Sequence, residues 1–217
     1  MLGIHPLEAV SIAMSNVERQ VVAAFDFDGT LTRRETLLAF LIYTLGVTRV
    51  VYDALALSPT LVGFGLGLVP NDVAKQRLFV QCLGGMRMDE LENCGKQFAE
   101  QMLPRLMREE SMQRLAWHQQ QGHRCVVISA SMTLYVSPWA IKVGFDDVLA
   151  TNLEARADRT TTGKFFGENC YGIEKVKRLE ALLGKRESYT LYAYGDSRGD
   201  TELLDMADFA YYREMPE

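Results

Sequence analysis

Five short apolar segments, each about as long as a buried strand, set the strongest limit on the fold. They are rich in Val, Ile, Phe and Tyr, mostly end at polar residues or glycine, and span residues 20–25, 124–128, 147–150, 190–194 and 208–212. Helical patterns lie between them at residues 109–122, 132–144 and 173–184. Alternating strands and helices predict an α/β fold, in which helices cover both faces of a parallel sheet.

A long insertion separates the first two of these strands. Nearly a hundred residues lie between Thr30 and Arg124, far more than one crossover needs. Their apolar spacing predicts helices and no convincing strand, with the helices at residues 35–46, 47–57, 71–85 and 88–107. We therefore expect residues 1–34 and 115–217 to form the core domain and residues 35–114 to form a separate helical domain.

One part of the insertion, residues 54–69, carries no charged side chain. It is short for a membrane span, and Pro59 and three glycines interrupt it. A packed helix followed by a glycine-rich loop is the favoured interpretation. The alternative is a surface that meets lipid or an apolar substrate.

Composition limits the classes of partner and compartment. About half of the 217 residues are apolar, which is enough for a buried core, and the net charge of −5 without a long basic run argues against nucleic-acid binding. The four cysteines lack the spacing of a zinc site or a disulfide framework, which favours a reducing, cytoplasmic location. Residues 1–15 have no basic start or clear cleavage site, so we interpret them as an amphipathic lead-in rather than a signal peptide.

The sequence VVAAFDFDGT places Asp26 and Asp28 at the end of the first apolar strand. Side chains alternate along a strand, so both carboxylates leave on one side and Phe27 leaves on the other. Two such carboxylates repel unless a cation lies with them, and their hard oxygen atoms suit Mg²⁺. Gly29 allows a tight turn and the close approach of an anion.

A second acidic group follows a later strand in LYAYGDSRGD, which contains Asp196 and Asp200. The ends of parallel strands open on the same edge of a sheet, where such folds bind ligands. Asp26, Asp28 and Asp196 can then share one metal ion. A bare Asp-x-Asp pair, or GDSRGD alone, is more often an ordinary turn. DFDGT after an apolar strand is much more specific, and paired with it GDSRGD predicts a metal site.

Two further segments supply groups that can hold a phosphate. In VVISAS, Ser129 and the backbone N–H of Ala130 follow the second strand just before a helix, where anions bind, although serine there is also a common helix cap. Lys175 borders the apolar stripe of the helix over 173–184, and we favour it over Lys177 and Arg178 as the cation that offsets the carboxylates. By itself, a lysine there would usually be solvated.

Taken in their order along the chain, DFDGT, VVISAS, Lys175 and GDSRGD resemble the four motifs of the haloacid dehalogenase (HAD) superfamily of phosphohydrolases. Within it, the chain is most similar to the phosphoserine-phosphatase-like subfamily IB. The resemblance implies a Rossmann-like parallel-sheet core with an inserted, all-helical type 1 cap domain. It also implies an Mg²⁺-dependent phosphatase acting on a small phosphorylated substrate. Whether water or another hydroxyl accepts the phosphoryl group, and the oligomeric state, stay open.

The resemblance assigns a role to each residue. Asp26 would be the nucleophile that forms an aspartyl-phosphate, and Asp28 would be the general acid and then the base. Asp26, the Asp28 backbone carbonyl and Asp196 would bind Mg²⁺, and Asp200 would be a further ligand or a support. Ser129, Ala130 and Lys175 would hold the phosphate.

The substrate is less constrained. In phosphoserine phosphatases a carboxylate at the position of Glu35 meets the substrate amine, but residues 32–35 also fit a capping box, which we favour. The fourth motif reads GDSRGD where those enzymes tend to have GDGxND, which weakens the assignment of phosphoserine. Two alternatives remain: a lipid-phosphate phosphatase similar to phosphatidylglycerophosphate phosphatases that touches the membrane surface, and a catalytically idle binding domain.

Overall fold

The computed structural model describes residues 19–216, so the predicted lead-in at residues 1–15 lies outside the described part. A six-stranded sheet has the order β4-β3-β2-β1-β5-β6. Its strands are β1 (Gln20–Phe25), β2 (Arg124–Met132), β3 (Asp147–Ala155), β4 (Thr161–Phe166), β5 (Tyr189–Gly195) and β6 (Phe209–Tyr212). All neighbours pair in parallel except β3 and β4, which are antiparallel. The predicted α/β fold is therefore confirmed.

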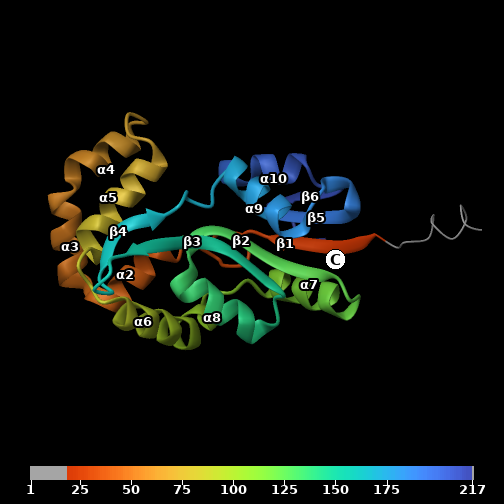
Figure 1. Cartoon of the computed structure of the whole chain (residues 1–217), viewed down its shortest axis with the longest axis horizontal. Coiled ribbons are helices and arrows are strands. Elements are labelled where there is room, and N and C mark those ends of the chain that lie inside the picture. Colours follow the sequence, from red (N-terminus) through yellow and green to blue (C-terminus); the bar gives the residue numbers. More distant parts are fainter. Residues whose placement is uncertain (1–18, 217) are drawn as a thin grey trace, which may run out of the picture.

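Helices cover both faces of the sheet, as expected. α9 (Ile173–Leu183) and α10 (Thr201–Asp205) lie on one face, and α7 (Glu109–Gln120) and α8 (Thr133–Val143) lie on the other (Figure 1). Alternate residues of β1 divide between the two layers: Val22 and Ala24 belong to the apolar cluster under α9, whereas Ala23 and Phe25 belong to the cluster under α7 and α8. The two-sided burial explains why the strand sequences are apolar throughout.

Strand β4 was not anticipated from the sequence, and β3 runs five residues beyond its expected end at residue 150. β3 and β4 form an antiparallel pair that extends toward the helical insertion. Phe165 of β4 meets Phe79 of the insertion edge-on, with ring centroids 5.7 Å apart. The β4 sequence TTGKFF is too short and mixed to be recognised without this long-range contact.

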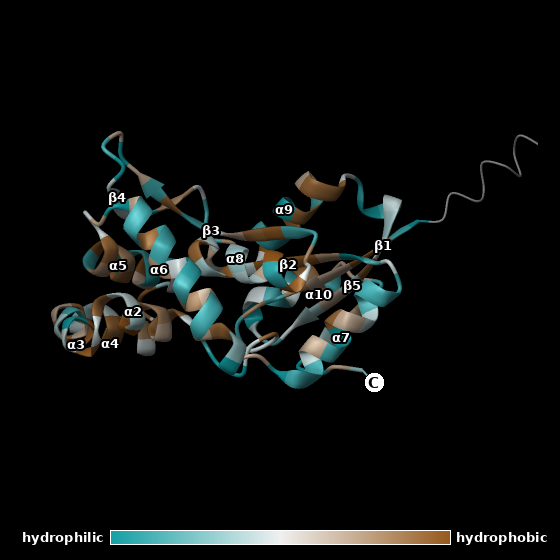
Figure 2. Cartoon of the chain, turned by 90° about the horizontal axis from the view of Figure 1, so that it is seen from below, coloured by the Kyte–Doolittle hydropathy of each residue, from teal (hydrophilic) through white to brown (hydrophobic). Residues whose placement is uncertain are grey.

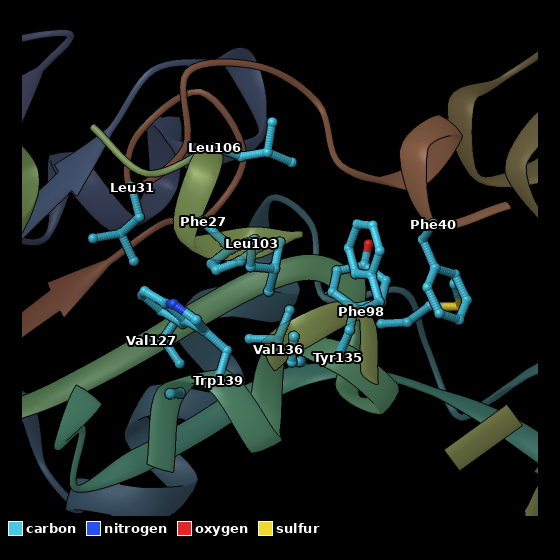
Figure 3. Close-up of a cluster of buried hydrophobic side chains, with 14 of the residues drawn as sticks. Phe27, Leu31, Phe40, Phe98, Leu103, Leu106, Val127, Tyr135, Val136 and Trp139 are labelled. Atoms are coloured by element: carbon cyan, nitrogen blue, oxygen red, sulfur yellow. The ribbon is translucent and has the colours of Figure 1, made fainter. Parts of the chain in front are cut away.

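The insertion is built from helices, and Figure 1 shows them together at one end of the sheet. They are α2 (Leu37–Leu45), α3 (Val47–Ala56), α4 (Ser58–Gly65), α5 (Asn71–Leu83), α6 (Met88–Gln101) and the 3₁₀ turn η1 (Leu103–Arg105). Phe40 of α2 and Phe98 of α6 both pack against Tyr135 of α8, with ring centroids 4.9 and 5.4 Å apart (Figure 3). One apolar cluster thus joins the insertion to the layer beneath the sheet.

The uncharged segment 54–69 departs from the favoured prediction of a packed helix. It contains the end of α3, all of α4 and a turn, and most of its large apolar side chains are exposed, including Leu55, Phe64, Leu66 and Leu68. Among residues 19–216, no helix is by itself long and apolar enough to cross a membrane. Leu37–Leu45 and Val47–Ala56 together meet that length and composition, but they are bent by 117°.

Candidate active site

The first acidic motif lies directly beyond the end of β1. The backbone N–H of Asp26 donates to the carbonyl of Tyr194 on β5 (2.9 Å), which extends the parallel pairing by one residue. Phe27 turns into the apolar cluster and meets Trp139 with ring centroids 5.2 Å apart (Figure 3). As expected, Phe27 points into the apolar cluster, whereas Asp26 and Asp28 line the cavity on its other side. The buried ring anchors the turn that carries the two acids.

Lys175 is buried between two carboxylates rather than solvated. Its Nζ lies 2.5 Å from Oδ1 of Asp26 and 2.5 Å from Oδ1 of Asp200. Burial would lower the pKa of Lys175, but Asp26 and Asp200 outweigh it and raise that pKa above its ordinary value. Burial raises the pKa of Asp26 to about 7, although Lys175 opposes the rise. The lysine therefore holds the two acids together and favours the charged form of Asp26.

Asp28 faces a different set of partners. Its Oδ1 accepts hydrogen bonds from the backbone N–H (2.9 Å) and hydroxyl (2.7 Å) of Thr36, and its Oδ2 accepts one from the Ser131 hydroxyl. Burial raises the pKa of Asp28, and the bonds from Ser131 and Thr36 oppose the rise. A carboxyl group fixed in direction and raised in pKa suits proton transfer.

Asp196 completes an acidic cluster with Asp26 and Asp200, whose carboxylate oxygens lie within 4.8 Å of one another. Hard oxygen ligands at this spacing fit Mg²⁺. Gly29 makes the approach possible: it has a φ of +78°, and a Cβ there would lie 2.2 Å from Oδ2 of Asp196. The Asp28 carboxylate is turned toward Thr36 and Ser131 and is not part of this cluster. Metal binding by the Asp28 backbone carbonyl stays a prediction.

Asp200 supports the loop as well as Lys175. Its Oδ2 accepts hydrogen bonds from the backbone N–H groups of Asp196 (3.2 Å) and Ser197 (3.0 Å) and from the Ser197 hydroxyl (2.9 Å). Ser197 and Asp200 form a capping box at the 3₁₀ turn η3 (Arg198–Asp200). This network orients the Asp196 backbone at the end of β5.

A cavity of about 450 Å³ opens beside these groups and is of ordinary size for a small-molecule site. Its lining includes Asp26, Asp28, Lys175, Ser129 and Ala130, so the structure brings these predicted residues together. Ser129 and Ala130 belong to β2, which continues to Met132 before α8 begins; they do not directly precede the helix as expected. The Ser129 hydroxyl accepts a hydrogen bond from the backbone N–H of Ser131 (3.0 Å).

Glu35 also lines this cavity, and the capping-box interpretation of residues 32–35 is wrong. The helix begins at Leu37 and has no side-chain cap, whereas the Thr32 hydroxyl donates to the carbonyl of Arg34 (2.8 Å). Burial raises the pKa of Glu35, and the nearby Asp28 adds to the rise. The local pattern was misleading because the chain turns toward the cavity before the helix starts.

Lys75 is the main site residue that sequence reasoning missed. It projects from α5 into the cavity, and its Nζ donates to the carbonyl of Ala130 (2.6 Å), which joins the insertion to the end of β2. Burial lowers the pKa of Lys75, while Asp28 and Glu35 oppose this effect. A signal did exist, because Lys75 is one turn from the buried Phe79 and so lies on the inner face of α5.

Thr36 and Ser131 were missed as well. Ser131 follows Ser129 by two residues and so lies on the same side of β2, which is a signal in VVISAS. Thr36 lacks such a signal, because its contact with Asp28 depends on the path of the loop before α2.

Comparisons with known proteins bear on the family of this chain. The family model for haloacid dehalogenase-like hydrolases matches residues 23–205. The protein CicA of Caulobacter vibrioides is 35% identical over 193 residues, which cover 89% of this chain and 86% of the relative. The histidinol-phosphatase of Neisseria meningitidis serogroup C is 31% identical over 124 residues, which cover 54% of each protein.

Two solved structures show the same fold. A protein of unknown function from Bordetella pertussis Tohama I has a TM-score of 0.73 at 22% identity, with 86% of each chain covered. A substrate-bound phosphoserine phosphatase has a TM-score of 0.59 at 17% identity, with 88% of this chain and 84% of that chain covered.

Proposed function

The chain belongs to the haloacid dehalogenase-like hydrolase family, and from this premise we propose that it is an Mg²⁺-dependent phosphatase of small phosphate monoesters. The observation that carries the proposal is that Asp26, Asp28, Ser129 and Lys175 line one cavity, while Asp196 lies beside it in the carboxylate cluster with Asp26 and Asp200. The partial match to a histidinol-phosphatase supports the reaction class. The free thiols of the four cysteines are consistent with a cytoplasmic location.

We assign the nucleophile to Asp26. A carboxylate oxygen of Asp26 attacks phosphorus, and the bond between phosphorus and the ester oxygen breaks. The leaving oxygen takes its electron pair and the proton of the Asp28 carboxyl group. Water then attacks the aspartyl-phosphate, gives a proton to Asp28, and releases inorganic phosphate and Asp26.

The remaining residues position the phosphate and balance charge. Ser129 and the backbone N–H of Ala130 would donate to phosphate oxygens, and Lys175 would offset their charge. Mg²⁺ would be held by Asp26, the Asp28 carbonyl and Asp196, with Asp200 in support, and would supply electrostatic stabilisation of the transferring group.

The helical insertion is proposed to act as a cap that excludes water and selects the leaving group. We propose a core that begins within the described chain at residue 19 and resumes with α7, and a cap that lies between residue 35 and the start of α7. The boundary at residue 114 expected from the sequence would divide α7 (Glu109–Gln120), which covers the sheet. Lys75 supports this role because it reaches from α5 to the Ala130 carbonyl across the cavity.

The test is hydrolysis of p-nitrophenyl phosphate by wild type and Asp26→Asn, with Mg²⁺ or with EDTA. We expect activity that needs the metal and falls roughly a thousandfold or more in Asp26→Asn, with an unchanged circular dichroism spectrum. Asp72→Asn is the matched control, because Asp72 is exposed on α5 and does not line the catalytic cavity.

Near-wild-type turnover by Asp26→Asn would refute the nucleophile assignment, and full activity in EDTA would refute the metal requirement. If the folded wild type hydrolyses no ester in a broad panel, the idle binding domain becomes the better explanation.

A further inference from the structure

The catalytic cavity has two ends of different chemistry. One end holds the carboxylates, Lys175 and the end of β2. The opposite wall comes from α2, α4 and α5, which contribute Leu37, Leu61, Phe64, Ala74, Lys75 and Leu78. Among the residues that the structure describes, Lys75 is the one polar side chain that these three helices bring to the lining.

The other polar residues of the lining, Ser131, Tyr171 and Ser197, belong to β2 or lie at the loop after β5, on the carboxylate side of the cavity. The helical wall therefore offers few polar partners to a leaving group. Lys75 already donates to the Ala130 carbonyl, and Glu35, the acidic group before α2, lies beside Asp28 and Lys75. The hydroxyls of a sugar or nucleoside need buried hydrogen-bond partners, and apart from Lys75 this wall consists of leucine, alanine and phenylalanine, whose side chains supply none.

The apolar wall continues out of the cavity onto the surface. Leu61 and Phe64 line the cavity yet are 37% and 44% exposed, so they stand at its mouth. Beyond them, Leu66 and Leu68 are 69% and 77% exposed. Figure 2 shows brown, hydrophobic stretches in this end of the insertion, and the sequence has no charge from residue 54 to 69. An apolar surface that runs into a catalytic cavity marks a binding site for an apolar group.

We propose that the substrate is an amphiphilic phosphate monoester, whose phosphate lies at Asp26 and whose hydrocarbon portion passes between Leu61 and Phe64 toward the surface. This inference rests on the proposed function and deepens it by naming the substrate class. Hydrolysis places the oxygen of water on phosphate and its proton on the ester oxygen, so the products are inorganic phosphate and an apolar alcohol.

The test measures kcat/KM for monomeric ethyl, butyl and hexyl phosphate. In the wild type we expect a rise of roughly three- to fourfold for each added methylene group. Phe64→Ser is expected to flatten this series because it removes the apolar wall. Leu68→Ser is the matched control: its side chain is exposed and does not line the cavity, so the rise should persist.

A second arm separates a free amphiphile from a lipid. Dihexanoyl phosphatidic acid is supplied as a monomer, and long-chain phosphatidic acid is supplied in phosphatidylcholine vesicles. Faster hydrolysis of the monomer supports a free amphiphile. Faster hydrolysis of the vesicle substrate supports substrate taken from a lipid surface, provided that Leu68→Asp slows hydrolysis of the vesicle substrate and leaves hydrolysis of the monomer unchanged.

A wild-type series that is flat or falls with chain length would overturn the inference. If p-nitrophenyl phosphate hydrolysis in the same preparation still depends on Asp26, the proposed function stands and only the substrate class fails. If no ester is hydrolysed, both fail together.

Discussion

Substitution of Lys175 by methionine tests the charge arrangement on which the site is built. The Lys175 side chain is 2% exposed and is the cation shared by Asp26 and Asp200. Methionine fills a similar volume but leaves two buried carboxylates without their cation. Removing one partner of a buried ion pair typically costs about 3–5 kcal/mol, a large part of the stability of an average domain.

Urea unfolding followed by circular dichroism, in EDTA so that no metal replaces the lost cation, measures this cost. A loss of about 4 kcal/mol lowers the midpoint by roughly 2 M when the urea slope is near 2 kcal/mol per molar. Lys177→Met is the matched control on the same helix. The Lys177 side chain is 65% exposed and 3.9 Å from Glu174, so we expect a change below about 0.5 kcal/mol.

The pH dependence gives a second readout with a definite sign. Burial raises the pKa of Asp26 to about 7 even though Lys175 lowers it. Without Lys175 that pKa rises further above the value in the unfolded chain, which is near 4. The folded variant then retains a proton above pH 7 that the unfolded chain has lost, so its deficit relative to wild type grows as the pH rises through and beyond 7.

The reasoning would be refuted if Lys175→Met lost less than about 1 kcal/mol of unfolding free energy. It would also be refuted if the stability difference from wild type were equal at pH 6 and pH 8.5. The double variant with Asp200→Asn removes one of the uncompensated charges. It is therefore expected to recover part of the lost stability.

Two further substitutions test the loop and the cap. Gly29→Ala is expected to lower Mg²⁺ affinity, measured by calorimetry, at least tenfold, because the methyl group would displace Asp196. Gly46 has the same φ of +78° but nothing lies within 4 Å of a Cβ built there. Gly46→Ala should therefore cost only the backbone strain, about 1–3 kcal/mol in unfolding free energy. Lys75→Met is expected to lower kcat/KM for an aryl phosphate by roughly tenfold or more, since it removes a cation beside the cavity. An unchanged kcat/KM would exclude Lys75 from substrate handling, and exposed Lys177→Met is again the control.

The core of the fold and several site positions could be predicted because their signals are local. A strand buried on both faces must be apolar along most of its length, so β1, β2 and β5 can be recognised in the sequence as short apolar segments. The acids that follow β1 and β5 meet because parallel strands end at a common edge. The order of the motifs then identified the family, which the comparisons confirm.

Other features depended on contacts between distant parts of the chain. Lys175 lies 149 residues from Asp26, and its burial between two acids cannot be read from a helical pattern that usually places lysine in solvent. Glu35 fitted a capping box by sequence, yet the helix starts later and Glu35 lines the cavity.

By itself, the sequence determined which residues can carry the chemistry and which strands bring them to one edge, because periodicity and strand ends are set by neighbouring residues. Only the tertiary structure decided which groups face one another: Lys175 between Asp26 and Asp200, Lys75 against Ala130, and Phe64 at the cavity mouth. The physical reason is that burial and ion pairing depend on the packing of segments far apart in the chain, and local propensity does not contain that information.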